Sequence, residues 1–224
     1  MKVTVAIDGP AAAGKSTVAK LIAQKLGYTY IDTGAMYRAY TWYCMEQGVD
    51  CTDHDASIVF AGKISIVLKP DGTVLCNDVD VTRAIREPRV SANVSYIASY
   101  KEVRLFLVDQ QRKLAGEHSV IMDGRDIGTY VLPNADVKIY QIASVETRAI
   151  RRYDENVEKG IPCTLEEIQE DVRKRDYIDS HRDFAPLRCA DDAITLDTSD
   201  MSIEEVVNAI IEIIENKIKV LESK

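Results

Sequence analysis

Residues 9–16 read Gly-Pro-Ala-Ala-Ala-Gly-Lys-Ser, between an apolar run at 3–7 and a helical pattern that begins at Thr17. A Gly-x-x-x-x-Gly-Lys-Ser turn between a strand and a helix is the Walker A phosphate-binding loop. In this setting backbone N–H groups converge on a phosphate at the helix N-terminus, where the helix dipole favours an anion. The pattern therefore predicts a site for a nucleoside triphosphate or a close relative of one.

The residues of this loop have separate expected roles. Lys15 is expected to reach the β- and γ-phosphates, and the Ser16 hydroxyl to bind Mg²⁺ as the cofactor. The predicted ATP-binding residues are Gly9, Pro10, Ala11, Ala12, Ala13, Gly14, Lys15, Ser16 and Thr17.

Length and charge limit the kind of protein. A chain of 224 residues with 46% hydrophobic content can form one large core with inserted lobes. The net charge of −8 argues against nucleic acid as the main partner, although a local arginine pocket can still hold a small anion. The N-terminus has no basic leader and no apolar run approaches eighteen residues, so we expect a cytoplasmic protein without a membrane segment.

Cysteine and histidine give no sign of a metal centre. The five cysteines form no Cys-x-x-Cys pair, which is typical of reduced thiols and not of a zinc site or a disulfide framework. The three histidines lie apart without metal-ligand spacing and are expected to be solvated or loosely packed.

Five β-prone runs alternate with helical patterns along the chain. The expected strands are 3–7, 28–32, 119–123, 135–142 and 193–197, and the expected helices are 17–23, 35–47, 90–98, 101–115, 145–159, 165–178 and 202–221. This alternation predicts an α/β fold with a doubly wound, parallel, five-stranded sheet and helices on both faces. Such a sheet binds ligands at the carboxyl ends of its strands, where 9–16, 32–34 and 123–126 all fall.

One segment departs from the alternation. Runs at 64–68 and 74–76 flank Pro70-Asp71-Gly72, which is a strong turn signal. We therefore expect an inserted antiparallel sheet over about 63–84. Because no repeat, low-complexity stretch or linker is present, the whole chain 1–224 is predicted to be one domain with inserted lobes.

A phosphate loop alone does not separate a kinase from an ATPase, a GTPase or a transporter motor, so the other charged residues carry the argument. Arginines gather near the expected strand ends and late in the chain, at 38, 104, 125, 148, 151, 152, 175, 182 and 188. The planar guanidinium fork suits phosphate binding. About half of these residues, taken singly, fit solvated helix faces equally well.

The arginines also bear on the acceptor. A hydroxyl acceptor needs a carboxylate base, whereas a phosphate acceptor is already an anion and needs only alignment and neutralisation. The arginines favour a phosphate, although Asp32 and Asp123 keep a hydroxyl acceptor open. Asp123 ends an apolar strand and looks more like an acid that supports Mg²⁺ through a water molecule.

Four segments in this order resemble bacterial cytidylate kinase: 32–38, 103–112, 123–129 and 173–187. The likeness covers nearly the whole chain. That family phosphorylates CMP and dCMP with ATP and Mg²⁺ on a nucleoside-monophosphate kinase fold. The resemblance implies a core of about 1–34, 116–144 and 185–224, an acceptor-binding lobe of about 35–115 and a helical lid of about 145–184.

The resemblance also implies residue roles. Arg38, Arg125 and Arg182 would hold the acceptor phosphate, Ser95, Arg104 and Asp126 would line the cytosine, and Arg175 and Asp179 would face the ribose. Cytosine carries an amino donor beside N3 and O2, so a carboxylate with guanidinium donors can read its edge, whereas uracil would leave the carboxylate unpaired.

The remaining predicted site residues either have two possible roles or complete the acceptor and catalytic sites. Arg175 and Asp179 also fit an ordinary helix-surface pair, and Tyr37 fits either acceptor contact or core packing. The predicted acceptor site is completed by Thr33. Lys15, Arg125, Arg151 and Arg182 are the predicted catalytic residues, with Arg151 on a lid helix beside Arg148 and Arg152.

Ala12 departs from the family pattern, in which many members carry glycine at this position. Its side chain indicates either a negative φ at this residue or slight strain in the loop.

Two other functions stay open from the residues alone. One is a phosphate-loop kinase for a small-molecule hydroxyl; the other is a nucleotide-dependent switch without a second substrate. The switch is disfavoured because no Asn-Lys-x-Asp motif is present and a second arginine-lined site has no use in it. No obligate interface is evident, so we expect a monomer.

Overall fold

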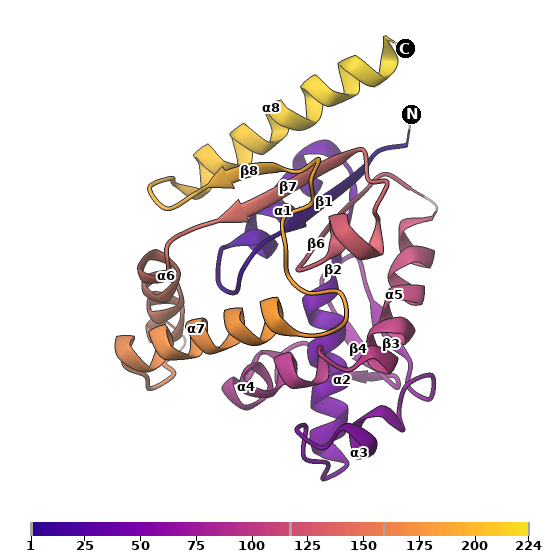
Figure 1. Cartoon of the computed structure of the whole chain (residues 1–224), viewed down its shortest axis with the longest axis vertical. Coiled ribbons are helices and arrows are strands. Elements are labelled where there is room, and N and C mark those ends of the chain that lie inside the picture. The colour runs from indigo at the N-terminus through magenta and orange to yellow at the C-terminus, as the bar shows by residue number, and fades with distance from the viewer. Residues whose placement is uncertain (1, 117, 159, 224) are drawn as a thin grey trace.

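The computed structural model describes residues 2–116, 118–158 and 160–223. Its central sheet has the order β2-β6-β1-β7-β8, and all neighbouring strands are parallel (Figure 1). These strands are β1 (Thr4–Asp8), β2 (Thr29–Asp32), β6 (Val120–Gly124), β7 (Val137–Ile142) and β8 (Ile194–Asp197). The predicted doubly wound, five-stranded parallel sheet is confirmed.

Most of the helices were also predicted. They are α1 (Lys15–Leu26), α2 (Thr33–Glu46), α3 (His54–Ile58), α4 (Pro88–Ile97), α5 (Lys101–Ala115), α6 (Val145–Glu158), α7 (Leu165–His181) and α8 (Ile203–Glu222). The five-residue α3 was missed because it is too short to show a helical period. Two short turns were also missed: the 3₁₀ turn η1 (Ala84–Arg86) and the π-helical turn η2 (Ile127–Val131). Among the helices that the structure describes, none combines the length and the apolar character needed to span a membrane.

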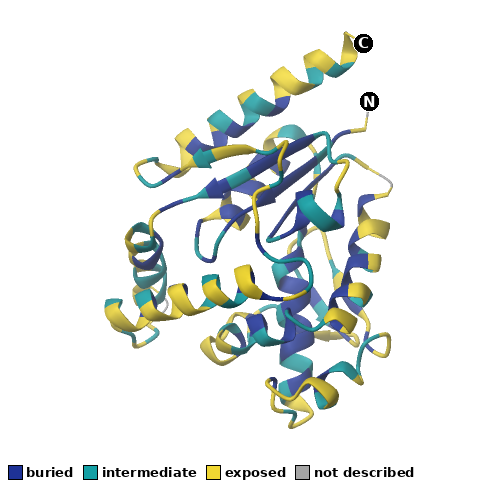
Figure 2. Cartoon of the chain, viewed as in Figure 1, coloured by how far each residue is buried: buried dark blue, intermediate teal, exposed yellow. Residues whose placement is uncertain are grey.

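Successive side chains of the central strands point into two different apolar cores. On β1, Val5 and Ile7 pack with α1 and α8 on one face, while Ala6 packs with α5 and η2 on the other. Such a two-sided sheet has to be apolar on both faces, which explains the continuous apolar run at the N-terminus. Figure 2 shows these strands as the buried centre of the molecule.

A second, antiparallel sheet interrupts the alternation as predicted. It contains β3 (Ile66–Leu68), β4 (Val74–Cys76) and β5 (Val79–Asp80). The strand β5 was not predicted, yet Asn77 and Asp78 both have positive φ, as the two-residue turn of a tight hairpin requires. This sheet packs with α2, α4 and α5 around a separate apolar core that includes Met36, Tyr40 and Ile97.

Two late helices begin with capping boxes. The predicted N-cap Thr164 accepts a hydrogen bond from the N–H of Glu167, whose side chain accepts one from the N–H of Thr164. Ser202 and Glu205 repeat this arrangement at α8. These bonds satisfy backbone donors that the first helical turn leaves free.

The helix α8 allows a matched test of the core. Ile210 is fully buried against the sheet, while Ile203 on the same helix is 55% exposed. Ile210→Ala should lower the free energy of unfolding by about 2–5 kcal/mol because it removes packed methyl groups and leaves a cavity. Ile203→Ala should change it by less than about 0.5 kcal/mol. Urea unfolding followed by circular dichroism measures both; equal losses would contradict this packing.

Candidate active site

The phosphate loop leaves β1 at the carboxyl edge of the sheet and enters α1. Gly9 has φ of 152°, and a Cβ atom there would overlap the carbonyl oxygen of Gln141 on β7. Only glycine fits this close approach. The Gln141 side chain then donates a hydrogen bond to the carbonyl of Ala13 at 2.6 Å, so β7 holds the loop at two points.

Ala12 corrects one expectation. Its φ is 58°, in the left-handed region, so the prediction of a negative φ is wrong and the alternative of slight loop strain agrees with the geometry. A non-glycine residue in this region costs about 1–2 kcal/mol because its Cβ crowds the following carbonyl. The path of the loop is set by its anchored ends, which force the turn through this residue.

Lys15 lies buried in the loop, with 4% of its surface exposed. Its Nζ donates a hydrogen bond to the carbonyl of Pro10 at 2.7 Å. Burial, and then the nearby positive charge of Arg125, hold the pKa of Lys15 well below its usual value. Two neighbouring cations in a buried place favour an anion between them.

Ser16 and Asp123 meet as expected for a metal-supporting pair. The Ser16 hydroxyl donates to one carboxylate oxygen of Asp123 at 2.7 Å, and the Tyr30 hydroxyl donates to the other at 2.8 Å. Burial and the neighbouring Asp32 raise the pKa of Asp123. A hydroxyl and a carboxylate beside a phosphate loop are oxygen ligands of the kind that Mg²⁺ prefers, so these residues fit the ion. Within residues 2–116, 118–158 and 160–223, no three His, Cys, Asp or Glu side chains gather as a metal-holding group.

Asp126 bridges two of the predicted arginines. The turn after β6 carries Asp126, α5 carries Arg104, and Arg182 follows α7. Arg104 forms a short ion pair with Asp126 and also donates to the carbonyl of Ala98 at 3.0 Å. Arg182 lies 3.4 Å from the other carboxylate oxygen and donates to the carbonyl of Ala185 at 2.8 Å. All three side chains are buried, so three distant segments converge on one ionic cluster.

A second cluster forms around Asp179 on α7. Arg125 donates to its carboxylate at 2.8 Å and Ser95 of α4 donates to the other oxygen at 3.1 Å. Burial raises the pKa of Asp179, but Arg125, Arg175 and Arg182 together hold it below its usual value. Burial and the charge of Arg125 lower the pKa of Arg175 to about 10.

Several donors in this region have no partner. Among the described residues, the buried Nε atoms of Arg38, Arg104 and Arg175 donate no hydrogen bond. The guanidinium of Arg104 packs over the ring of Tyr37, with its Cζ 5.2 Å from the ring centroid. The Nη2 of Arg38 lies 3.3 Å from Oδ2 of Asp32. Buried donors without acceptors are costly, so their gathering at one edge of the sheet is typical of a site that binds an anionic ligand.

Two predicted site residues, Thr33 and Arg151, donate their hydrogen bonds to groups outside the two arginine clusters. The Thr33 hydroxyl donates to the carbonyl of Asp123 at 2.6 Å, which ties α2 to β6. Arg151 donates to the carbonyl of Thr198 at 2.6 Å, next to α8, and is not brought to the arginine clusters. The neighbouring Arg152 pairs with Glu155 at 3.0 Å.

A link between α6, α7 and the phosphate loop was not predicted. Asp176 of α7 accepts a hydrogen bond from the N–H of Ala11 at 3.1 Å and pairs with Arg148 of α6 at 2.7 Å. Arg148 in turn donates to the carbonyl of Ala11 at 2.9 Å. Figure 1 shows the two helices beside each other next to the end of β7. Asp176 was given no role because it directly follows the basic run Arg173-Lys174-Arg175, whose arginines were the predicted ligand contacts.

Asp8 was also missed, although it directly precedes the loop. It is 5% exposed and accepts hydrogen bonds from the N–H groups of Ile127 and Gly128 at 2.8 and 2.7 Å. An acid that ends an otherwise apolar strand is a signal that could have identified it.

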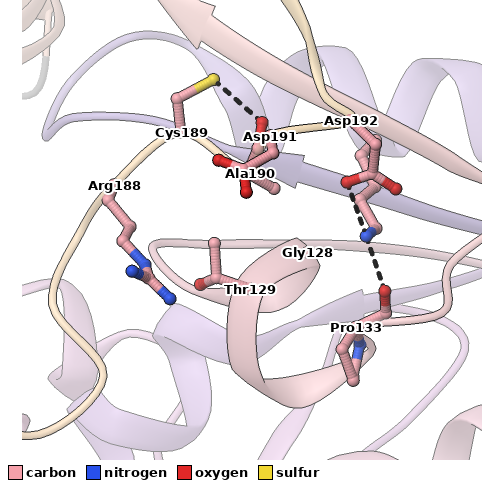
Figure 3. A pocket seen from close by; sticks show the side chains of 9 residues that line it. Gly128, Thr129, Pro133, Arg188, Cys189, Ala190, Asp191 and Asp192 are labelled. Carbon is pink, nitrogen blue, oxygen red and sulfur yellow. Dashed lines mark hydrogen bonds and ion pairs between the residues drawn. The ribbon is translucent and has the colours of Figure 1, made fainter.

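A small cavity of about 220 Å³ lies behind the turn that contains Gly128 (Figure 3). Lys138 closes one side of it by donating to the carbonyl of Pro133 at 2.6 Å and pairing with Asp192 at 2.8 Å. The exposed Arg188 and Cys189 belong to the opposite wall. This cavity is distinct from the phosphate loop and the two arginine clusters.

The sequence matches known proteins over nearly its whole length. The cytidylate kinase family model matches residues 5–216. A protein named cytidylate kinase from Lactiplantibacillus plantarum is 53% identical over 216 residues, which is 95% of each chain. Another of that name from Bacillus subtilis is 50% identical over 219 residues, or 96% of this chain and 98% of the relative.

A solved structure supports the fold alone. The crystal structure of an uncharacterized protein from Eubacterium ventriosum superposes with a TM-score of 0.53 at 12% identity, covering 96% of this chain and 99% of the other.

Asp176 gives a test of the link to the phosphate loop. Asp176→Asn should weaken ATP binding by about 3- to 10-fold, because the Arg148 charge loses its partner and Ala11 loses a strong acceptor. Asp171→Asn, an exposed acid on the same helix, is the control and should leave the Kd unchanged. Isothermal titration with ATP measures both. An unchanged Kd in Asp176→Asn would show that the loop does not depend on this acid.

Proposed function

Because the chain belongs to the cytidylate kinase family, we propose that it transfers the γ-phosphoryl group of ATP to the phosphate of CMP or dCMP. The products are ADP and CDP or dCDP. The observation that carries this proposal is the pairing of a phosphate loop with a second set of buried arginines at the same sheet edge. A single-ligand switch has no use for that second set.

The arginines match a phosphate acceptor. Lys15 approaches the transferring group from the loop, while Arg38, Arg125 and Arg182 hold the acceptor phosphate. Burial, and then repulsion from Arg125, lowers the pKa of Lys15 and of Arg175, and phosphates that lie between these cations relieve the repulsion. Since the attacking phosphate oxygen is already an anion, the residues need only align the two groups and neutralise their charge.

The acidic residues match the nucleoside. Asp126 accepts from the amino group of cytosine, and Arg104 and Ser95 donate to its acceptor atoms. Asp179 and Arg175 lie on the ribose side, while Thr33 and Tyr37 complete the wall. Uracil turns a carbonyl oxygen toward Asp126, so this buried carboxylate loses the amino donor of the base and faces another acceptor, which costs about 1–3 kcal/mol.

Ser16 and Asp123 are the residues that would hold Mg²⁺, with Asp123 acting through a water molecule. The ion supplies charge neutralisation at the β- and γ-phosphates. The Ser16 hydroxyl and the Asp123 carboxylate are already oriented toward each other at 2.7 Å, so little reorganisation is needed to form the site.

The helices α6 and α7 act as a lid in this proposal. Arg148 and Asp176 connect them to Ala11, which keeps the lid in register with the triphosphate. Arg151 reaches the transferring group only after it releases the carbonyl of Thr198. Closure excludes water and so suppresses wasteful hydrolysis of ATP. We further propose that the protein acts as a monomer in the cytoplasm.

An acceptor panel tests the reaction. ADP release is measured with ATP and Mg²⁺ in parallel with CMP, dCMP, UMP, AMP or no acceptor. CMP and dCMP should be turned over about 10- to 100-fold faster than UMP, because uracil sets a carbonyl oxygen against the Asp126 carboxylate where cytosine offers an amino donor. ADP release that does not depend on the acceptor, or no release with any of them, would overturn the proposal.

Arg182 separates a CMP kinase from a nucleotide switch. Arg182→Ala should lower kcat/KM for CMP by at least about 100-fold, because it removes a charged donor from the acceptor phosphate. The Kd for ATP should change by less than about 3-fold. Arg188→Ala, an exposed arginine in the following loop, is the matched control. Loss of ATP affinity with unchanged CMP kinetics would favour the switch.

A further inference from the structure

Asp8 has no role in the function proposed above, yet it connects the two halves of the site. Its carboxylate accepts the N–H groups of Ile127 and Gly128 at 2.8 and 2.7 Å. These residues directly follow Arg125 and Asp126. We call residues 124–128 the Arg125–Asp126 turn. Asp8 also directly precedes Gly9, the first residue of the phosphate loop.

We propose that Asp8 is a positioning residue that fixes the Arg125–Asp126 turn to the strand end from which the phosphate loop begins. The proposal rests on the proposed function, in which Arg125 and Asp126 contact the acceptor nucleotide. Asp8 touches neither substrate in this assignment. Its effect on the reaction passes through the distance and angle between the two binding sites.

The backbone of the turn explains why such an anchor is needed. The first N–H groups of a helical turn have no partner within it. At η2 these groups are buried and point toward β1, where the carboxylate of Asp8 is the acceptor. Without it the turn would keep unsatisfied buried donors, and a different path for residues 125–128 would become favourable.

Packing holds the turn from the other side. A Cβ atom at Gly128 would lie 3.1 Å from Cδ of Lys138 and 3.4 Å from the carboxylate of Asp8. Lys138 is itself held by hydrogen bonds from its Nζ to the carbonyl of Pro133 and to the carboxylate of Asp192. The turn therefore lies between a fixed carboxylate on β1 and a fixed lysine stem on β7, with no spare room for a side chain.

The charge of Asp8 gives the proposal a sharp test. Burial raises the pKa of Asp8 to about 7, while the two N–H groups lower it. Above this pKa the ionised carboxylate, beside two phosphate-binding sites, repels their ligands, so removing its charge should tighten anion binding if Coulomb forces alone matter. A positioning role predicts the opposite sign for the acceptor nucleotide.

The experiment compares Asp8→Asn with the wild-type enzyme. The amide keeps the shape but offers one acceptor oxygen and sets an NH₂ group against a backbone N–H. We expect the KM for CMP to rise by about 10-fold or more, and the preference for CMP over UMP to shrink. The Kd for ATP should stay within about 3-fold of the wild-type value.

Asp136→Asn is the matched control. Asp136 lies near the other end of β1 and also accepts two hydrogen bonds, from the N–H and the hydroxyl of Thr4, both at 2.8 Å. It should lower the melting temperature by a similar amount without changing either KM. A loss of CMP affinity in both variants would show that the effect is general destabilisation and would overturn the proposal.

Gly128→Ala keeps the test decisive if Asp8→Asn does not fold. Its methyl group presses on Asp8 and Lys138 from the turn itself, so the KM for CMP should rise by about 3-fold while ATP binding is unchanged. An unchanged or lower KM for CMP in a folded variant would overturn the positioning role. Absence of CMP turnover in the wild-type enzyme would instead overturn the proposed function.

Discussion

The arrangement of this protein depends on the burial of many opposite charges at one edge of a parallel sheet. Lys15, Asp123, Asp126 and Asp179 are each less than one-tenth exposed. A lone buried charge costs several kcal/mol, so each one requires a partner with good geometry. The acids stand on strand ends and on α7, while most of the cations come from loops and other helices. The charge pairs therefore determine where these helices can lie.

This constraint explains why the chain carries a second apolar core. The insertion that contains α2, α4 and α5 packs around its own small sheet, and α5 also packs on the central sheet through Val108 and Ala115. It carries Arg38, Ser95 and Arg104 to the carboxyl ends of the strands. The ionic clusters around Asp126 and Asp179 thus lie where the two cores meet. Polar groups at such a boundary can reorganise around a ligand without disturbing either core.

Much of this organisation was predictable from the sequence, for identifiable reasons. Strands that are apolar on both faces, separated by helical periods, predict the parallel sheet, and the sheet then places Asp123 and Arg125 beside the phosphate loop. The short elements η2 and β5 were missed because two to five residues carry no period. The backbone geometry of Ala12 stayed open between a negative φ and slight strain, because loop φ angles depend on how the ends are anchored, as by Gln141.

The contacts of single acids were harder to foresee than the clustering of the arginines. Asp8 and Asp176 bond to backbone N–H groups that belong to segments far away in the sequence. The place of Asp8 at the end of an apolar strand marks it as unusual, but nothing local in the sequence shows that the partner of either carboxylate is a main-chain amide more than a hundred residues away. Arginine clusters stand out by composition, whereas such acids are recognised only when the chain path is known.

The place of β1 in the sheet has a consequence for biosynthesis. The central strand β1 is made long before its two neighbours, because Thr4 pairs with Val120 of β6 and Val5 pairs with Val137 of β7. Until β6 and β7 are made, both hydrogen-bonding edges of β1 lack their partner strands. Pairing across so long a separation is slow and leaves the nascent chain open to aggregation. The phosphate loop therefore acquires its final shape late in synthesis, after Gln141 has emerged.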